Sequence, residues 1–255
     1  MATLTELSSS RHAGLKVRPD CVVDVVGRQH VVTVRAAEVG LAAAGMPVFV
    51  TASAQSGQRG LSALVSFEDG ENMMVEDGRW VGHYEPSVLR SYPLFLMQSD
   101  SDPRGYAVGI DESSTAFSET EGEALFDDSG NASAMQSQRT KLLEAGIDDD
   151  RRTQVFVQRL GELGLLRSVD VLVQYSSGEG KTIQGLQTID EDTLMQLESE
   201  TLTELHRDGY LLIMHAMLLS ISQVNRLIRA QNDREHLPDV AGVKLQAARD
   251  VGEAF

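Results

Sequence analysis

Cysteine is nearly absent from this chain, and long uninterrupted apolar runs are absent altogether. Cys21 is the only cysteine among the 255 residues. The chain can therefore form neither an internal disulfide nor a thiolate zinc site, and it fits a reducing compartment. The longest apolar run, Tyr210 to Leu219, is interrupted by His215 and is shorter than the roughly 18 apolar residues of a membrane-spanning helix. We expect a buried core helix here and no membrane span.

The amino terminus also lacks the features of an export signal. Residues 1–10 contain neither the basic segment nor the apolar segment of a secretory signal peptide. Together with the single cysteine, this predicts a soluble, cytoplasmic protein and leaves association with the cell surface open.

Basic residues are scarce relative to acidic ones. Lysine and arginine together number 22, against 38 aspartates and glutamates, which gives a formal net charge of −16. Nucleic-acid binding draws most of its affinity from basic groups that neutralise phosphate. The charge therefore argues against nucleic acid and against an anionic membrane surface as partners, while strong acidity helps to keep a protein in solution.

The pattern of the first half of the chain predicts strands. Residues 14–112 contain several short β-branched runs separated by turn residues. Two of these runs, Cys21–Val26 and His30–Val34, lie on either side of Gly27-Arg28 and predict a hairpin. A short helix is predicted from Glu38 to Ala44.

Helical patterns dominate residues 131–231. We predict helices over 133–145, 151–163 and 210–229, and a hairpin over 169–189. Gly146 is expected to end the first of these helices. The predicted architecture is α+β, with a β-rich N-terminal half and a helical C-terminal half packed against it in one domain over residues 1–231. Residues 232–255 are polar and are predicted to form a tail.

Three motifs resemble parts of catalytic sites, but each is incomplete. Gly180-Lys181-Thr182 matches the end of a phosphate-binding loop and lacks its earlier glycine. His83-Tyr84-Glu85 has the spacing of a zinc deaminase, without the two cysteines that complete such a metal site. His206-Arg207-Asp208 has the spacing of an iron site, without a well-placed third ligand. We predict no metal and no cofactor, we assign no catalytic residue, and enzymatic activity is disfavoured without being excluded.

Aromatic and arginine side chains gather in one stretch that includes the only tryptophan. The candidate binding residues in this stretch are Arg79, Trp80, Tyr84, Arg90 and Tyr92. One interpretation is a packed aromatic corner with an arginine stacked on a ring. The other is a surface for a ligand or partner, because aromatic and arginine residues dominate binding hot spots.

His215 is a further candidate, because it lies within the long apolar run. Burying an imidazole costs free energy unless its ring nitrogens find partners. It is either a core histidine bonded to a backbone carbonyl or a carboxylate, or a base or ligand contact in a pocket.

Several short blocks of the chain resemble the bacterial SapC family. The blocks are His12 to Leu15, Glu38 with Met46-Pro47-Val48-Phe49, Asn72-Met73-Met74-Val75 with Asp77 to Trp80, and Tyr84-Glu85-Pro86 with Leu89-Arg90 and Tyr92-Pro93-Leu94. With further matches in the second half, the resemblance covers residues 12–231.

The resemblance implies a biological setting and no reaction. The family takes its name from a link to paracrystalline bacterial surface layers, and its members tend to be encoded near flavin-dependent tryptophan-halogenase-like proteins. Three functions are open. The first is a non-enzymatic accessory or binding protein of surface-layer or envelope biology, acting on a protein partner. The second is a partner in a halogenase or oxygenase pathway that recognises a peptide or metabolite. The third is an enzyme with an unrecognised site.

Overall fold

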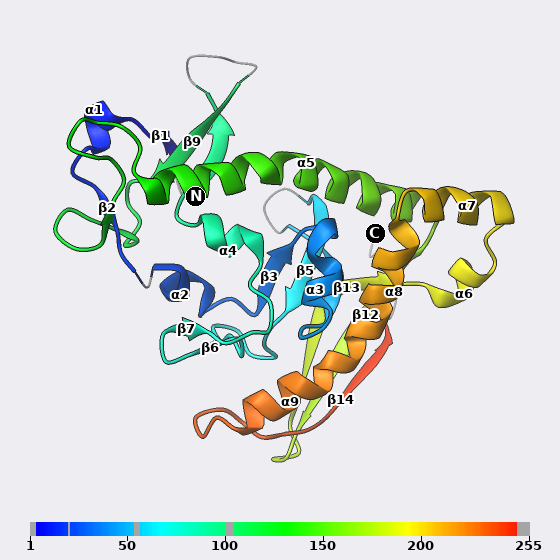
Figure 1. The fold of residues 1–255 in the computed structure, drawn as a ribbon. Helices are drawn as coiled ribbons and strands as arrows, with labels where there is room; N and C mark the ends of the chain where they lie inside the picture. The colour runs from blue at the N-terminus through cyan, green and yellow to red at the C-terminus, as the bar shows by residue number, and fades with distance from the viewer. Residues whose placement is uncertain (1–3, 20, 54–56, 100–104, 249–255) are drawn as a thin grey trace, which may run out of the picture. The chain divides into compact units, whose positions relative to one another are not determined.

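The computed structural model describes residues 4–19, 21–53, 57–99 and 105–248, and it has the predicted α+β fold (Figure 1). Every strand pairing among these residues is antiparallel. The chain divides into two compact units. The first consists of Met1–Arg28, Val75–Val81 and Glu85–Asp148, and the second of Gln29–Met74, Gly82–Tyr84 and Asp149–Phe255. Each unit draws on three segments, so neither is a contiguous half of the chain.

The first unit contains short strands and short helices. Its strands are β1 (Leu4–Glu6), β2 (Lys16–Val17), β6 (Val75–Glu76), β7 (Arg79–Trp80), β8 (Phe95–Gln98), β9 (Tyr106–Asp111), β10 (Phe117–Ser118) and β11 (Glu123–Ala124). They pair in the orders β1-β9-β8, β10-β2-β11 and β6-β7. Its helices are α1 (Ser9–His12), α2 (Cys21–Val26), α4 (Ser87–Ser91) and the first part of α5 (Ala134–Glu162). Its buried core consists of Val17, Cys21, Leu94, Ile110, Ala116, Leu125, Phe126 and Leu143.

The predicted strand at Cys21–Val26 is wrong, because these residues form helix α2. Cys21 and Val26 are almost fully buried in this helical conformation, and such packing outweighs the modest β preference of the valines between them. Gly27 follows the helix, and a Cβ there would lie 2.6 Å from the carbonyl oxygen of Val23. The glycine taken for a hairpin turn is therefore the residue that lets the chain leave the helix.

The second unit is built around one sheet of six strands. The strands are β3 (Val31–Val34), β4 (Val48–Ala52), β5 (Arg59–Leu64), β12 (Leu166–Tyr175), β13 (Gly180–Ile189) and β14 (Val240–Ala247), in the order β14-β12-β13-β4-β5-β3. The helices are η1 (Ala36–Glu38), α3 (Val39–Ala42), the second part of α5, α6 (Glu191–Met195), α7 (Ser199–Arg207), α8 (Tyr210–Ser220), η2 (Ile221–Gln223) and α9 (Val224–Asn232). Helix α8 packs on β13 and β4, and α9 packs on β14.

The hairpin predicted over 169–189 is confirmed as β12 and β13. The break predicted at Gly146 is wrong, because α5 runs without interruption from Ala134 to Glu162. A glycine inside a helix costs only about 1 kcal/mol relative to alanine. Contacts further along the helix offset that cost, since Arg35 pairs with Asp150 at 2.7 Å and the Ala36 N–H donates to the Thr153 hydroxyl at 2.9 Å.

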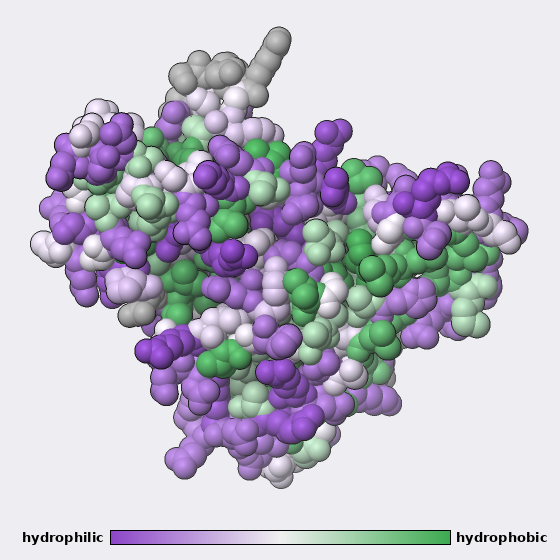
Figure 2. Space-filling model, in the orientation of Figure 1, coloured by the Kyte–Doolittle hydropathy of each residue, from purple (hydrophilic) through white to green (hydrophobic). Residues whose placement is uncertain are grey.

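The long apolar helix predicted over 210–229 is present, but it is not buried all round. It begins after Gly209, whose φ of 77° stops α7 from continuing, and it passes through α8, η2 and α9. By length and composition, Tyr210–Asn232 could cross a membrane, and only 28% of its most apolar stretch is buried. Leu212 and Leu219 are 77% and 75% exposed, and Figure 2 shows apolar side chains on the surface around α8. Apolar residues on every face of a helix give no indication of which face will pack.

The predicted polar tail is partly wrong, because Val240–Ala247 forms the edge strand β14 and pairs with β12 along its length. The Asn232 side chain fixes the start of this strand. It accepts a hydrogen bond from the Val240 N–H at 2.7 Å and donates one to the Val240 carbonyl at 3.0 Å. Backbone hydrogen bonds to a neighbouring strand therefore order this segment, although the composition of the tail alone does not predict a strand. The part of the predicted tail beyond Ala248 lies outside the described residues.

Candidate functional site

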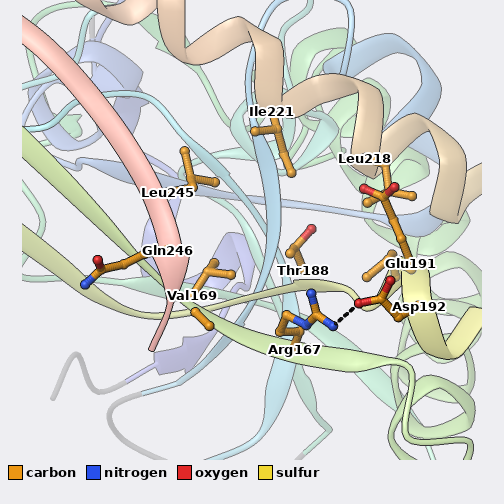
Figure 3. A pocket seen from close by; sticks show the side chains of 11 residues that line it. Arg167, Val169, Thr188, Glu191, Asp192, Leu218, Ile221, Leu245 and Gln246 are labelled. Carbon is orange, nitrogen blue, oxygen red and sulfur yellow. Dashed lines mark hydrogen bonds and ion pairs between the residues drawn. The ribbon is translucent and has the colours of Figure 1, made fainter. Parts of the chain in front are cut away.

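A cavity lies on the helix-covered face of the six-stranded sheet, where β12, β13 and β14 meet α6 and the junction of α8 with η2. Arg167 on β12 and Thr188 on β13 are direct partners in the hairpin register. Directly opposed residues project from the same face of a sheet. The strand pairing therefore places a charged side chain next to a hydroxyl, beneath Leu218 of α8 and Ile221 of η2 (Figure 3).

The cavity has the size of a small-molecule site. Its volume is about 420 Å³, within the roughly 300–1,000 Å³ of pockets that hold small ligands. Its apolar lining consists of Val169, Ile189, Leu218, Ile221, Leu245 and Ala247. Its polar lining consists of Arg167, Thr188, Glu191, Asp192 and Gln246. Apolar and polar side chains thus line the cavity in similar number, which makes it more polar than most small-molecule sites.

Two carboxylates hold the guanidinium of Arg167 in place. Its Nε and Nη2 donate to the two carboxylate oxygens of Asp190 at 3.0 and 2.8 Å, and Nη2 also donates to Asp192 at 2.8 Å. Asp190 in turn caps α6 by accepting a hydrogen bond from the Thr193 N–H at 3.2 Å. The Thr193 N–H, and then Arg167, lower the pKa of Asp190. The carboxylate therefore stays ionised, and the arginine is oriented before any ligand arrives.

Thr188 is buried and its hydroxyl is not satisfied. The residue is 6% exposed, and within the described part of the chain its Oγ1 has no hydrogen-bond partner. Leaving a buried polar group unpaired costs about 1–3 kcal/mol. Figure 3 shows this hydroxyl directed between Ile221 and Leu218, and a guanidinium nitrogen of Arg167 directed toward Thr188. The wall of the cavity thus contains a buried hydroxyl for which the described residues provide no partner.

The residues predicted from the aromatic stretch do not form one group. Arg79, Trp80, Arg90 and Tyr92 belong to the first unit, and Tyr84 belongs to the second. Arg79 and Trp80 form β7 and pair with β6 across a tight turn, with Arg79 exposed and Trp80 half-buried. Arg90 is exposed on α4. A ligand role for these residues stays a prediction.

The two tyrosines of that stretch have structural partners. The Tyr84 hydroxyl donates to the nearly buried carboxylate of Glu38 at 2.6 Å. The Tyr92 hydroxyl lies 3.2 Å from the Ser114 hydroxyl, and its ring packs edge-on against Phe95 with centroids 5.9 Å apart. Burial raises the pKa of Tyr92. These contacts match the interpretation of a packed aromatic corner at Tyr92.

His215 is exposed on α8, so its predicted burial is wrong. Its Nδ1 lies 2.6 Å from the Leu211 carbonyl oxygen and donates to it, one helical turn earlier. The predicted backbone-carbonyl partner is therefore present, at the surface rather than in the core. The residue lies on the side of α8 that carries exposed Leu212 and Leu219, and it is not part of the lining of the cavity in Figure 3.

His12, unlike His215, is buried, and both of its ring nitrogens are hydrogen-bonded. The Nδ1 of His12 accepts a hydrogen bond from the Ser8 N–H at 3.0 Å, so the other ring nitrogen carries the proton and donates to Glu112 at 2.7 Å. That hydrogen bond, and then the charge of Arg11, lower the pKa of Glu112. Both ring nitrogens have structural partners, and His12 therefore links α1 to the residue that follows β9.

Sequence reasoning missed Arg167 and Thr188. One signal was available, because Thr188-Ile189-Asp190 ends a predicted strand with a helix-capping aspartate. An arginine across the hairpin is well placed to meet that aspartate. The approach of α8 and β14 was not available, since neither the packed face of α8 nor the existence of β14 was predicted. Among the described residues, no group of three or more histidine, cysteine, aspartate or glutamate side chains is arranged to hold a metal ion.

The fold and this site define an antiparallel α+β protein with a small-molecule-sized cavity on the helix-covered face of its main sheet. The family model SapC matches residues 7–227, which is most of the chain. The chain therefore belongs to the SapC family, as its sequence blocks predicted. No curated protein and no solved structure matches it.

Proposed function

We propose that this SapC-family protein is a non-enzymatic accessory protein that works by binding, and that it holds a small ligand in the cavity of Figure 3. The observation that carries the proposal is the Thr188 hydroxyl, which is buried at the cavity and has no partner in the described part of the chain. Buried hydroxyls are normally hydrogen-bonded, so an outside group that satisfies this one removes a cost from the folded protein.

The charged groups at the cavity favour binding over catalysis. Arg167 stays protonated at all ordinary pH values and cannot accept a proton. Asp190 is committed to Arg167 and to the α6 cap, and its pKa is lowered, which makes it a weak base. The cavity therefore supplies orientation and hydrogen bonds, which are the requirements of a recognition site.

Two biological settings are compatible with a binding role. The first is surface-layer or envelope biology, to which the name of the family refers, and there the ligand would be part of a protein partner. A cavity of about 420 Å³ favours the other setting, recognition of a metabolite or of a single peptide side chain beside a flavin-dependent halogenase or oxygenase. In both settings the chain itself carries out no reaction.

The test is a fragment screen followed by ¹H–¹³C NMR of the methyl groups. We expect fragments to shift the methyl signals of Leu218, Ile221 and Leu245. Substitution Ile221→Trp fills the cavity and should abolish the shifts of the Leu218 and Leu245 methyl signals, while Ile228→Trp on α9 is the matched control and should preserve them. The proposal fails if no fragment shifts these methyl signals, or if the shifts persist in the folded Ile221→Trp variant.

A further inference from the structure

The chemistry of the cavity restricts the kind of molecule it can take, and its hydrogen-bonding groups set the first restriction. Thr188 Oγ1 has no partner in the described part of the chain. Arg167 bonds to Asp190 and Asp192 through Nε and Nη2. Its Nη1 has no hydrogen-bond partner among the described residues. Both groups can donate a hydrogen bond. A ligand oxygen above this face of the sheet can accept a hydrogen bond from both side chains, because they project from directly opposed positions of the two strands.

Charge sets the second restriction. Arg167 contributes one positive charge at the cavity, whereas Asp190, Glu191 and Asp192 contribute three negative ones. The local balance is negative, and the chain as a whole carries −16. This negative balance makes an added carboxylate or phosphate less favourable at the cavity than a neutral group. The acceptor of the ligand is therefore a neutral oxygen and not a carboxylate or phosphate.

The apolar walls set the third restriction. Val169 and Leu245 of the sheet face Leu218 and Ile221 of the helical layer across the cavity (Figure 3). Apolar area removed from water between such walls is the main source of affinity for a small ligand. The ligand thus needs an apolar body attached to its single polar group.

We infer that the cavity takes an uncharged amphipathic molecule, with its apolar part between the sheet and the α8–η2 junction and a carbonyl-type oxygen set between Thr188 Oγ1 and Arg167. The inference rests on the proposed function, because it assumes that the cavity is the place where a ligand is held. It adds the chemical class of that ligand and excludes anions.

Three probes with one apolar body test the ligand class: 3-phenylpropanamide, 3-phenylpropanoate and 3-phenylpropylamine. Their affinities for the full chain are measured by titration of the Leu218, Ile221 and Leu245 methyl signals. We expect the amide to bind about tenfold or more tightly than the carboxylate, the factor that corresponds to one well-made hydrogen bond. Carboxylate or amine binding as tight as that of the amide would overturn the inference.

Two sets of variants identify the groups responsible. Thr188→Val should weaken amide binding about fivefold to tenfold by loss of one hydrogen bond, while Thr188→Ser keeps the hydroxyl and should restore it. Thr182→Val, exposed on the same strand and outside the cavity lining, is the control and should bind the amide normally. Glu191→Gln removes a negative charge at the cavity without removing a partner of Arg167, and it should improve carboxylate binding relative to amide binding. Equal amide affinity in wild type and a folded Thr188→Val variant would contradict the assignment.

The two levels of the proposal fail in different ways. If no fragment of any charge perturbs the cavity methyl groups, the proposed binding function is wrong. If other fragments bind there and the amide does not, or if anions are preferred, the binding function stands and the ligand class is wrong.

Discussion

The phenol of Tyr175 donates a hydrogen bond of 2.5 Å to the carboxylate of Glu68, which is 107 positions earlier in the chain. The same Glu68 oxygen accepts a bond from Gln231 at 3.2 Å, and the other oxygen lies 3.5 Å from the ammonium of Lys181. One carboxylate therefore connects the loop after β5, the β12–β13 hairpin and helix α9. Gln231 is fully buried, so this network lies partly in the core, where it joins α9 to the sheet.

Removing the Tyr175 hydroxyl should destabilise the fold. Tyr175→Phe keeps the ring and deletes one hydrogen bond to a charged group, a type of bond worth about 1.5–3 kcal/mol. We expect the free energy of unfolding, measured by urea denaturation, to fall by about 1–2 kcal/mol, because Lys181 and Gln231 remain to stabilise the carboxylate. Tyr106→Phe, at a 66% exposed tyrosine, is the control and should change little. Equal stability of the two variants would mean that the Tyr175 bond contributes nothing.

Tyr175 also predicts how stability depends on pH in the alkaline range. Burial, and then Glu68, raise the pKa of Tyr175 above its ordinary value of 10.0. A group whose pKa is raised by folding stabilises the protein below its unfolded pKa and loses that contribution as pH rises through the folded value. Unfolding free energies of the wild type should therefore fall more steeply above pH 10 than those of Tyr175→Phe. Parallel curves would contradict the raised pKa, since the other tyrosines are common to both proteins.

The parts of the fold that were predictable are those in which local pattern and tertiary packing agree. The β12–β13 hairpin has alternating residues and a glycine-rich turn, and both its strands and its turn were predicted. Helix α2 shows the opposite case, because the valines between Cys21 and Val26 favour a strand while the core of the first unit accepts a helix. Strand β14 was missed because it lies in the stretch that was predicted to be a polar tail. Its residues are ordered by backbone hydrogen bonds to β12, and amino-acid composition gives no sign of that pairing.

The candidate site was less predictable than the fold. Its polar pair, Arg167 and Thr188, becomes visible only when the hairpin register is known. Leu218 and Ile221 line the cavity from the helical side only because one face of the apolar helix packs inward. The sequence does not show which face that is, because apolar residues lie all round the helix. The aromatic stretch, by contrast, was predicted as a candidate site because it is rich in rare residues. Two of those residues have structural contacts: Tyr84 bonds to Glu38, and Tyr92 packs against Phe95.

Asp190 should matter more than its neighbour Asp192 for stability. Asp190 caps α6 and pairs with Arg167 through both oxygens, whereas Asp192 is 75% exposed and holds Arg167 by one bond. We expect Asp190→Ala to lower the melting temperature and Asp192→Asn to leave it nearly unchanged at neutral pH. Because the pKa of Asp190 is lowered, its contribution is present above its unfolded pKa and is lost as pH falls through the folded value. The difference between the two variants should therefore shrink in strong acid, and a difference independent of pH would contradict this.

The two sides of α8 should respond oppositely to substitution. Leu212 and Leu219 are 77% and 75% exposed, whereas Met217 is fully buried. The double variant Leu212→Glu/Leu219→Glu should keep the free energy of unfolding within about 0.5 kcal/mol of the wild type, as is usual for surface changes. Met217→Ala should lower it by about 2–5 kcal/mol, because it leaves a cavity in the core. A large loss in the glutamate variant would show that another surface covers this face in the purified protein.

The two halves of the sequence should not be separable by limited proteolysis. Strands β3, β4 and β5 come from residues 31–64, and β12, β13 and β14 come from residues 166–247, yet all six belong to one sheet. The connection between the two sets is the pairing of β4 with β13, at Val50 with Gln187 and Thr51 with Leu186. A cut between the halves leaves each with an unpaired, apolar strand edge, which is a strong template for reassociation. We expect nicked protein to elute as one species in native size-exclusion chromatography and to separate only in denaturant. Two halves that elute apart and each unfold cooperatively would contradict the prediction of a single domain.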